Sequence, residues 1–295
     1  MNFIRSILVP VDFSPAARNA YVYALRLAEE LRAELQLLHV VPPNVDNPGY
    51  GTFTGAVSTL MREKARTRMN EFQREGLRRA SPELRGIPSV DAFIREGDLN
   101  TTVRQHVNRE DNHLIVAGTD GSSGWWRDLT GTNASSLIHH APCPVLVVHR
   151  KWAYHPPRAL CYATDLQDTG TLWADNLFRV FATFGPVIHF VHVQDKNTPD
   201  VGYSFDVLRK LFRGSDLAQR VTFTHLTADD ISRSILDFAT KRGCDLIVMT
   251  RPRKPWLQRT FGGSNTREAV LHSIVPLLIL SPQDVTARPI RGASV

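Results

Sequence analysis

V-A-G-T-D-G-S-S-G-W-W-R-D-L-T-G-T-N-A, the sequence from Val116 to Ala134, carries three structural signals in a row. The apolar run that leads into it is typical of a buried strand, a glycine-rich loop follows, and helical spacing of apolar residues begins at Ala134. Together these features form an arrangement that binds phosphate. Glycines let the backbone approach an anion closely, and the free N–H groups of the first helical turn point at it.

The glycines of this loop have a defined spacing. Gly118 and Gly121 are separated by two residues, Gly121 and Gly131 by nine, and Thr132 follows directly. This pattern is neither the dinucleotide motif G-x-G-x-x-G nor the P-loop motif G-x-x-x-x-G-K-[ST], so neither of those mechanisms is indicated. It resembles the G-2x-G-9x-G-[ST] signature of ATP-binding universal stress proteins.

Three further segments resemble the same family, in the family's order. Residues 7–14, I-L-V-P-V-D-F-S, are similar to its opening strand with an acidic turn. Residues 38–40, L-H-V, are similar to its second strand, and residues 140–148, H-A-P-C-P-V-L-V-V, to its closing strand. Four separated motifs make the resemblance specific. It implies a Rossmann-like domain of the adenine nucleotide alpha hydrolase type, with an open five-stranded parallel sheet flanked by helices.

The resemblance also implies an ATP site, with Mg²⁺ entering together with the nucleotide. The candidate residues are Pro10, Val11, Asp12, Val40, Ala117, Gly118, Gly121, Gly131, Thr132 and Asn133. In the family's arrangement the first three line the adenine and ribose end, and Val40 offers backbone contacts to adenine. Ala117 and Gly118 face the ribose and the α-phosphate, and the last four hold the phosphates. Two alternatives remain open: Asp12 as a turn carboxylate, and the glycines of the 118–121 turn as turn formers only.

The rest of the first half alternates strands with amphipathic helices. We expect strands at residues 3–11, 35–41, 90–95, 113–117 and 145–149. We expect helices from Pro15, capped by Ser14, to about Ala33, from about Ala56 to Ala80, and after Gly97-Asp98. The first helix presents one apolar face: Ala17, Tyr21, Ala24, Leu25, Ala28 and Leu31. This alternation predicts right-handed βαβ units and a parallel sheet covered on both faces.

The second half of the chain repeats the first. Residues 163–166 match residues 10–13, and residues 191–193 match residues 38–40, both 153 positions later (165 − 12 and 192 − 39). Later segments match at an offset of 132 (230 − 98 and 263 − 131). A repeat of this size indicates tandem domains and not a solenoid. We predict a first domain at 1–150, a linker at 151–157, a second domain at 158–281 and a flexible tail at 282–295.

The second copy lacks two of the loop glycines. Thr250 and Arg253 stand where the first copy has Gly118 and Gly121, and prolines interrupt the loop between and after them. A Cβ at either position removes the close backbone approach that a triphosphate needs. We therefore predict that the second domain does not bind ATP in the family's manner and has a mainly structural or interaction role. Binding of another anion by its basic loop remains an alternative.

Composition and charge give weaker indications. The chain has 295 residues, of which 42% are hydrophobic, and no apolar run approaches the roughly 20 residues of a membrane span. Three cysteines without C-x-x-C spacing argue against a disulfide framework and a structural zinc site, and we expect a cytoplasmic protein. The net charge of +6 is spread along the chain and densest at residues 62–79, where mixed signs indicate the outer face of a helix.

The resemblance implies a stress-response protein that binds ATP in its first domain as a regulatory ligand. Its domains would pair within the chain through the apolar strands at 145–148 and 277–280, a homodimer is possible, and neither membrane nor nucleic acid is an expected partner. One alternative is an ATP-dependent nucleotidyl or phosphoryl transferase; the other is a nucleotide-free module that binds a polyanion through its basic surface.

Catalysis has little support in the sequence. Asp120 and Asp128 lie near the loop, but no second motif makes either of them a base, and slow ATP hydrolysis would be incidental. His39, His189 and His192 lie in apolar strands, and we interpret them as core histidines and not as metal ligands. We assign no catalytic residue and no metal ligand.

Overall fold

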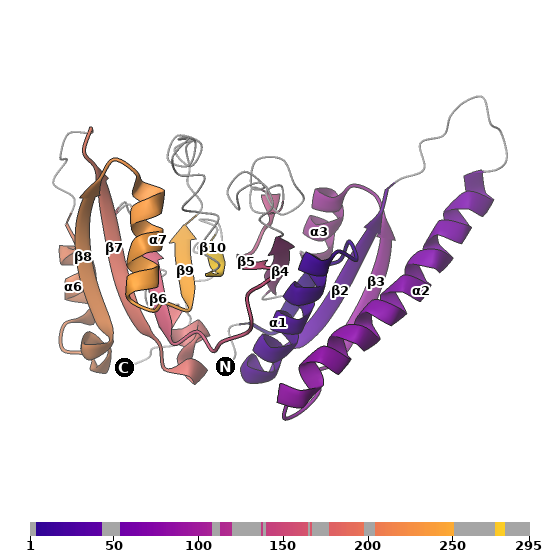
Figure 1. The fold of residues 1–295 in the computed structure, drawn as a ribbon, viewed down its shortest axis with the longest axis horizontal. Helices are drawn as coiled ribbons and strands as arrows, with labels where there is room; N and C mark the ends of the chain where they lie inside the picture. Colours follow the sequence, from indigo (N-terminus) through magenta and orange to yellow (C-terminus); the bar gives the residue numbers. More distant parts are fainter. Residues whose placement is uncertain are drawn as a thin grey trace, which may run out of the picture. The chain divides into compact units, whose positions relative to one another are not determined.

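The computed structural model describes residues 4–42, 54–107, 113–119, 137, 140–164, 166, 177–197, 204–250 and 275–280. The chain divides into two compact units, of which the first holds strands β1 to β5 and the second strands β6 to β10 (Figure 1). Each unit has a five-stranded parallel sheet with helices packed on it, which confirms the predicted fold class. In the described part of the chain, we find no helix with both the length and the hydropathy of a membrane span.

The first unit has the strand order β3-β2-β1-β4-β5, with every neighbouring pair parallel. Its strands are β1 (Ser6–Pro10), β2 (Glu34–Val41), β3 (Val90–Glu96), β4 (His113–Thr119) and β5 (Val145–His149). Its helices are α1 (Pro15–Leu31), α2 (Thr54–Ala80), the 3₁₀ turn η1 (Ser81–Glu83) and α3 (Leu99–Val107). The chain steps outward from β1 to β3 and then returns to β4, so the direction of winding changes between β1 and β4. In open α/β sheets, ligands bind beyond the carboxyl ends of the strands at such a point.

Helix α1 follows the sequence prediction closely. Ser14 caps it, since its Oγ accepts a hydrogen bond of 3.1 Å from the Ala17 amide, and Pro15 takes the first helical position. All six residues of the predicted apolar face are buried. The helix ends at Leu31, two residues before the predicted end, because Arg32 adopts a left-handed conformation with φ of 52° and its amide bonds back to the helix.

Helices α2 and α3 lie on the sheet in different ways. Helix α2 packs on α1 and on β2 through Ala65, Met69 and Phe72, whose side chains are buried, and the predicted charged face over residues 62–79 is exposed. Helix α3 belongs to the return crossover from β3 to β4, and a right-handed crossover in that direction places it on the opposite face of the sheet. A buried hydrogen bond of 2.7 Å between His106 Nε2 and Gln36 Oε1 connects α3 to β2.

The second unit repeats this arrangement with the strand order β10-β9-β6-β7-β8, again all parallel. Its strands are β6 (Ala159–Ala163), β7 (Val187–Asp195), β8 (Val221–Ala228), β9 (Leu246–Thr250) and β10 (Leu277–Leu280). Its helical elements in the described residues are η3 (Ala182–Phe184), α6 (Asp206–Phe212), η4 (Asp216–Arg220) and α7 (Ile231–Lys241). The predicted tail at 282–295 lies outside the described residues.

The sequence repeat is also a repeat of hydrogen bonds. In the first unit the Val11 amide donates to the Leu38 carbonyl (2.8 Å), and in the second unit the Thr164 amide donates to the Val191 carbonyl (2.9 Å). Both pairs are separated by the predicted 153 positions (164 − 11 and 191 − 38). The residue two places after each amide, Phe13 or Leu166, has a left-handed backbone, with φ of 65° and 59°. Each unit therefore turns out of its first strand in the same way.

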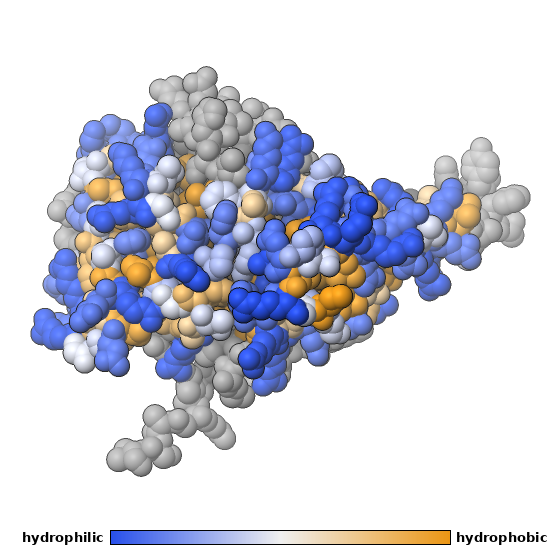
Figure 2. All heavy atoms as spheres, turned by 60° about the horizontal axis from the view of Figure 1, so that its bottom comes forward, coloured by the Kyte–Doolittle hydropathy of each residue, from blue (hydrophilic) through white to orange (hydrophobic). Residues whose placement is uncertain are grey.

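The surface is mostly polar where Figure 2 draws it, and the three cysteine side chains are buried. The face drawn in Figure 2 is mostly hydrophilic, with smaller hydrophobic areas between the charged side chains. Among the described residues, five large hydrophobic side chains are exposed: Leu60, Met61, Ile87, Val207 and Leu211. Cys143, Cys161 and Cys244 are buried free thiols.

Candidate functional site

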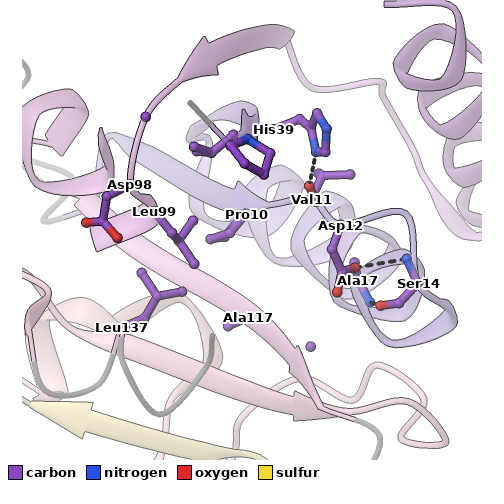
Figure 3. Close-up of a pocket in the computed structure, with 14 residues that line it drawn as sticks. Pro10, Val11, Asp12, Ser14, Ala17, His39, Asp98, Leu99, Ala117 and Leu137 are labelled. Atoms are coloured by element: carbon purple, nitrogen blue, oxygen red, sulfur yellow. Dashed lines mark hydrogen bonds between the residues drawn. The ribbon is translucent and has the colours of Figure 1, made fainter. Parts of the chain in front are cut away.

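A cavity of about 470 Å³ lies in the first unit, at the carboxyl ends of β1, β2 and β4 (Figure 3). Six of the ten predicted site residues line it: Pro10, Val11, Asp12, Val40, Ala117 and Gly118. The other four, Gly121, Gly131, Thr132 and Asn133, lie outside the described residues. Eight lining residues were not among the predicted ones: Ser14, Ala17, His39, Pro42, Gly97, Asp98, Leu99 and Leu137. The fold thus brings three separated segments of the prediction, from β1, β2 and β4, to one place.

The turn after β1 forms one end of the cavity. Asp12 Oδ1 accepts a hydrogen bond of 2.9 Å from the Ser14 amide, which holds the turn in the manner of an Asx turn. Asp12 therefore has the turn-forming role that the sequence left open, and its side chain also lines the cavity. The two roles are compatible because a carboxylate has two oxygens and about four lone-pair positions.

His39 holds the neighbouring wall in place. Its Nδ1 lies 2.6 Å from the Val11 carbonyl oxygen, and since a carbonyl only accepts, Nδ1 is the donor. The matching His192 makes the same contact with the Thr164 carbonyl, at 2.9 Å. In both units, this histidine binds the backbone at the end of the first strand; His192 is buried, as we expected for a core histidine, whereas His39 is half-buried and also lines the cavity. The ring of Phe13 packs on His39 with centroids 4.4 Å apart.

Gly118 is a glycine because the backbone of α1 comes very close to β4. A Cβ placed on Gly118 would lie less than 3.0 Å from the carbonyl carbon and oxygen of Ala16, and 2.8 Å from the Ala17 amide nitrogen. Its φ is not in the left-handed region, so turn geometry does not explain the residue. Close packing does, and it brings the start of α1 against the cavity wall.

Asp98 places a second carboxylate in the cavity, from the start of α3. It follows Gly97, whose φ of 146° favours glycine, and its Oδ1 accepts a hydrogen bond of 2.9 Å from the Thr101 amide. This hydrogen bond, with weaker ones from neighbouring groups, lowers the pKa of the exposed Asp98 carboxyl below its usual value. Asp98 is therefore an anion at neutral pH. The sequence alone indicates only a helix cap at Asp98. Its position directly after the third strand was the one feature that could have predicted its place near the site.

The matching positions of the second unit carry larger side chains. Met249 stands where the first unit has Ala117, and Thr250 where it has Gly118, at the offset of 132 (249 − 117 and 250 − 118). Met249 is buried, so its side chain takes up space inside the unit. At the counterpart of Gly97, Asp229 forms an ion pair of 2.9 Å with Lys196. The two units share a frame but differ at the wall that borders the cavity in the first.

The described walls offer a ligand two kinds of contact. Pro10, Val40, Leu99 and Leu137 provide apolar surface, and the two carboxylates accept hydrogen bonds. Among the described residues, no group of three or more His, Cys, Asp or Glu side chains is placed to hold a metal ion.

Known proteins resemble both halves of the chain. The model of the universal stress protein family matches residues 4–149 and again residues 157–281. A universal stress protein of Thermus aquaticus is 30% identical over 144 residues, which cover 49% of this chain and 98% of that protein. The crystal structure of a universal stress protein from Archaeoglobus fulgidus shares the fold over 95% of this chain and 97% of its own, with a TM-score of 0.67 and 18% identity. A universal stress protein solved in complex with cAMP matches 50% of this chain and 98% of its own, with a TM-score of 0.37 and 15% identity.

Proposed function

The chain belongs to the universal stress protein family, and from this premise we propose that its first unit binds ATP as a regulatory ligand in a stress response. Magnesium enters with the nucleotide, held mainly by phosphates and water. The second unit has a structural or interaction role. The protein acts in the cytoplasm, its two domains pair within the chain, and any slow ATP hydrolysis would be incidental to its role.

The cavity of the first unit carries this proposal. It gathers Pro10, Asp12, Val40 and Ala117 from three strands at the point where the winding of the sheet changes. Its volume of about 470 Å³ lies within the range of small-molecule sites, which is roughly 300–1,000 Å³. Strand β4 leads directly from the cavity into the glycine-rich loop, where backbone N–H groups would hold the phosphates.

One nucleotide per chain is expected. In the second unit Met249 and Thr250 replace the small residues Ala117 and Gly118, and Arg253 replaces a glycine in the loop. The Met249 side chain is buried and larger than the Ala117 methyl group at the matching position. The residues of the loop and those of the cavity wall are therefore two independent reasons to expect nucleotide binding in the first unit and not in the second.

Calorimetric titration of ATP with Mg²⁺ into nucleotide-free protein tests the proposal. Ala117→Met installs the residue of the second unit in the first, and Ala117→Ser is its matched control, since serine is small enough to keep the cavity open. We expect one site per chain in the wild type and in Ala117→Ser, and a loss of affinity of at least about tenfold in Ala117→Met. Gly118 is unsuitable for this purpose because its substitution disturbs folding as well as binding.

Three outcomes would contradict the proposal in different ways. If the nucleotide-free wild type does not bind ATP, the first unit is not a nucleotide site. If Ala117→Met binds as the wild type does, the nucleotide does not occupy this cavity. If two sites are found, and Arg253→Gly strengthens the second while Gly121→Arg abolishes the first, the second unit is a nucleotide site as well.

A further inference from the structure

We propose that Asp98 selects the base of the nucleotide by accepting a hydrogen bond from an exocyclic amino group, such as that of adenine. This inference rests on the proposed function, because it concerns a nucleotide bound in the cavity of the first unit. It adds a specificity-determining residue that the glycine signature does not contain.

The position of Asp98 argues for contact with the base. Figure 3 shows Asp98 and Asp12 on opposite sides of the cavity, with Leu99 and Pro10 between them. The neighbours of Asp98 in this view, Leu99 and Leu137, are apolar. An apolar wall suits the faces of a purine ring, and the few polar groups at such a wall fix the orientation of the ring.

The charge of Asp98 excludes phosphate from the same place. The carboxylate is an anion, and a hydrogen bond from Thr101 stabilises that form. The N-terminus of a helix commonly attracts an anion, but at α3 the Asp98 carboxylate already occupies that position. The phosphates of a nucleotide must therefore point away from Asp98, towards the loop that follows β4, and the base end of the ligand is left nearest to Asp98.

The hydrogen-bonding character of Asp98 suits a base that carries an amino group. Its Oδ1 accepts the hydrogen bond from the Thr101 amide, and weaker hydrogen bonds from the Thr101 side chain and from the Asn100 and Leu99 amides also act on the carboxylate. An ionised carboxylate accepts and never donates. It therefore favours a base that presents an amino group and disfavours one that presents a carbonyl oxygen at the same position.

The second unit supplies a matched residue without this role. Asp230 caps α7 as Asp98 caps α3, since its Oδ1 accepts a hydrogen bond of 2.9 Å from the Arg233 amide. Capping alone thus accounts for an aspartate at both positions. What distinguishes Asp98 is that it also lines the cavity of the first unit.

The test compares ATP with inosine triphosphate, in which a carbonyl oxygen replaces the amino group of adenine. Asparagine caps a helix about as well as aspartate does, so Asp98→Asn keeps the fold while its amide donates as well as accepts. We expect the wild type to bind ATP at least about tenfold more tightly than inosine triphosphate. In Asp98→Asn the two affinities should come within about threefold of each other. Asp230→Asn is the control and should keep the wild-type ratio.

Titration with 2′-deoxy-ATP separates the base from the ribose as the group that Asp98 contacts. The affinities of the wild type and of Asp98→Asn should fall by the same factor when the 2′-hydroxyl is removed. If the loss disappears in Asp98→Asn, the residue contacts the ribose and the inference is wrong. The inference is also wrong if Asp98→Asn melts at the wild-type temperature, and is therefore folded, but keeps the wild-type preference for ATP over inosine triphosphate. A wild type that binds no nucleotide overturns the proposed function itself, whereas tight ATP binding with an unchanged ratio overturns only the role of Asp98.

Discussion

Replacing Gly118 by alanine distinguishes two reasons for a glycine at the end of β4. If glycine is needed only so that a ligand can approach the backbone, alanine should leave the ligand-free protein intact. A glycine-to-alanine change at a compatible site even stabilises a protein by about 0.4–1 kcal/mol, because it restricts the unfolded chain. If glycine is needed because α1 packs there, alanine should destabilise the protein with no ligand present.

The structure predicts the second outcome. The added methyl group would lie closer than 3.0 Å to the Ala16 carbonyl carbon and oxygen, and these are backbone atoms at the start of a helix. They cannot rotate away as the end of a flexible side chain can, so α1 or β4 must shift. Overpacking of this kind costs roughly 3 kcal/mol, the upper part of its usual range. For a unit of this size that corresponds to a fall in melting temperature of about 10 °C.

Thermal unfolding of the full chain in nucleotide-free buffer is the assay. Gly86→Ala is the matched control, since no atom lies within 4 Å of a Cβ at Gly86 and its φ is not left-handed. The control should melt within a few degrees of the wild type, while the Gly118→Ala transition should move down by about 10 °C. A Gly118→Ala protein that melts at the wild-type temperature would refute the packing argument and restore ligand approach as the reason for the glycine.

Three further substitutions test the framework of the two units. Ser14→Ala removes the cap of α1 and should lower the free energy of unfolding by about 1 kcal/mol in urea titrations; no loss would mean that the cap is dispensable. Gln36→Leu removes the buried partner of His106 and should cost about 1–3 kcal/mol, with a double-mutant cycle showing coupling between the two residues; strict additivity would contradict this. Burial, and then the charge of Arg242, lower the pKa of His189 below its ordinary 6.5. The unfolded chain therefore binds this proton first, so stability should fall below about pH 6.5, and His189→Gln should flatten that fall; equal pH slopes in urea titrations from pH 5 to 7.5 would exclude the effect.

Local patterns in the sequence were sufficient to predict most of the first unit. Ser14-Pro15 is a cap followed by a helix start, and the apolar spacing after it places one face of α1 in the core. The strand at 145–149 was predicted with its exact bounds, because prolines define its start. Ends without such a marker moved by one to three residues: β4 continues to Thr119 and α1 ends at Leu31.

The remaining walls of the cavity could not be predicted because they depend on three-dimensional packing. Asp98 and Leu137 belong to no motif that marks a ligand contact, and only the folded chain brings them to the carboxyl ends of β1, β2 and β4. The reason for Gly118 was hidden in the same way. Its close neighbour Ala16 lies about a hundred positions earlier, so no local pattern records the contact.

The two units show which features belong to the fold and which to the site. Both keep the hydrogen bond from the second-strand histidine to the end of the first strand, so this contact serves the frame and says nothing about a ligand. Gly118 is different, because the second unit has Thr250 at the matching position and still forms a parallel sheet in the same order. The fold as such does not require glycine there. In the first unit, the close approach of α1 to β4 holds Ser14 and Ala17 at the edge of the cavity. The packing that requires glycine at position 118 therefore also shapes the cavity that we propose as the binding site.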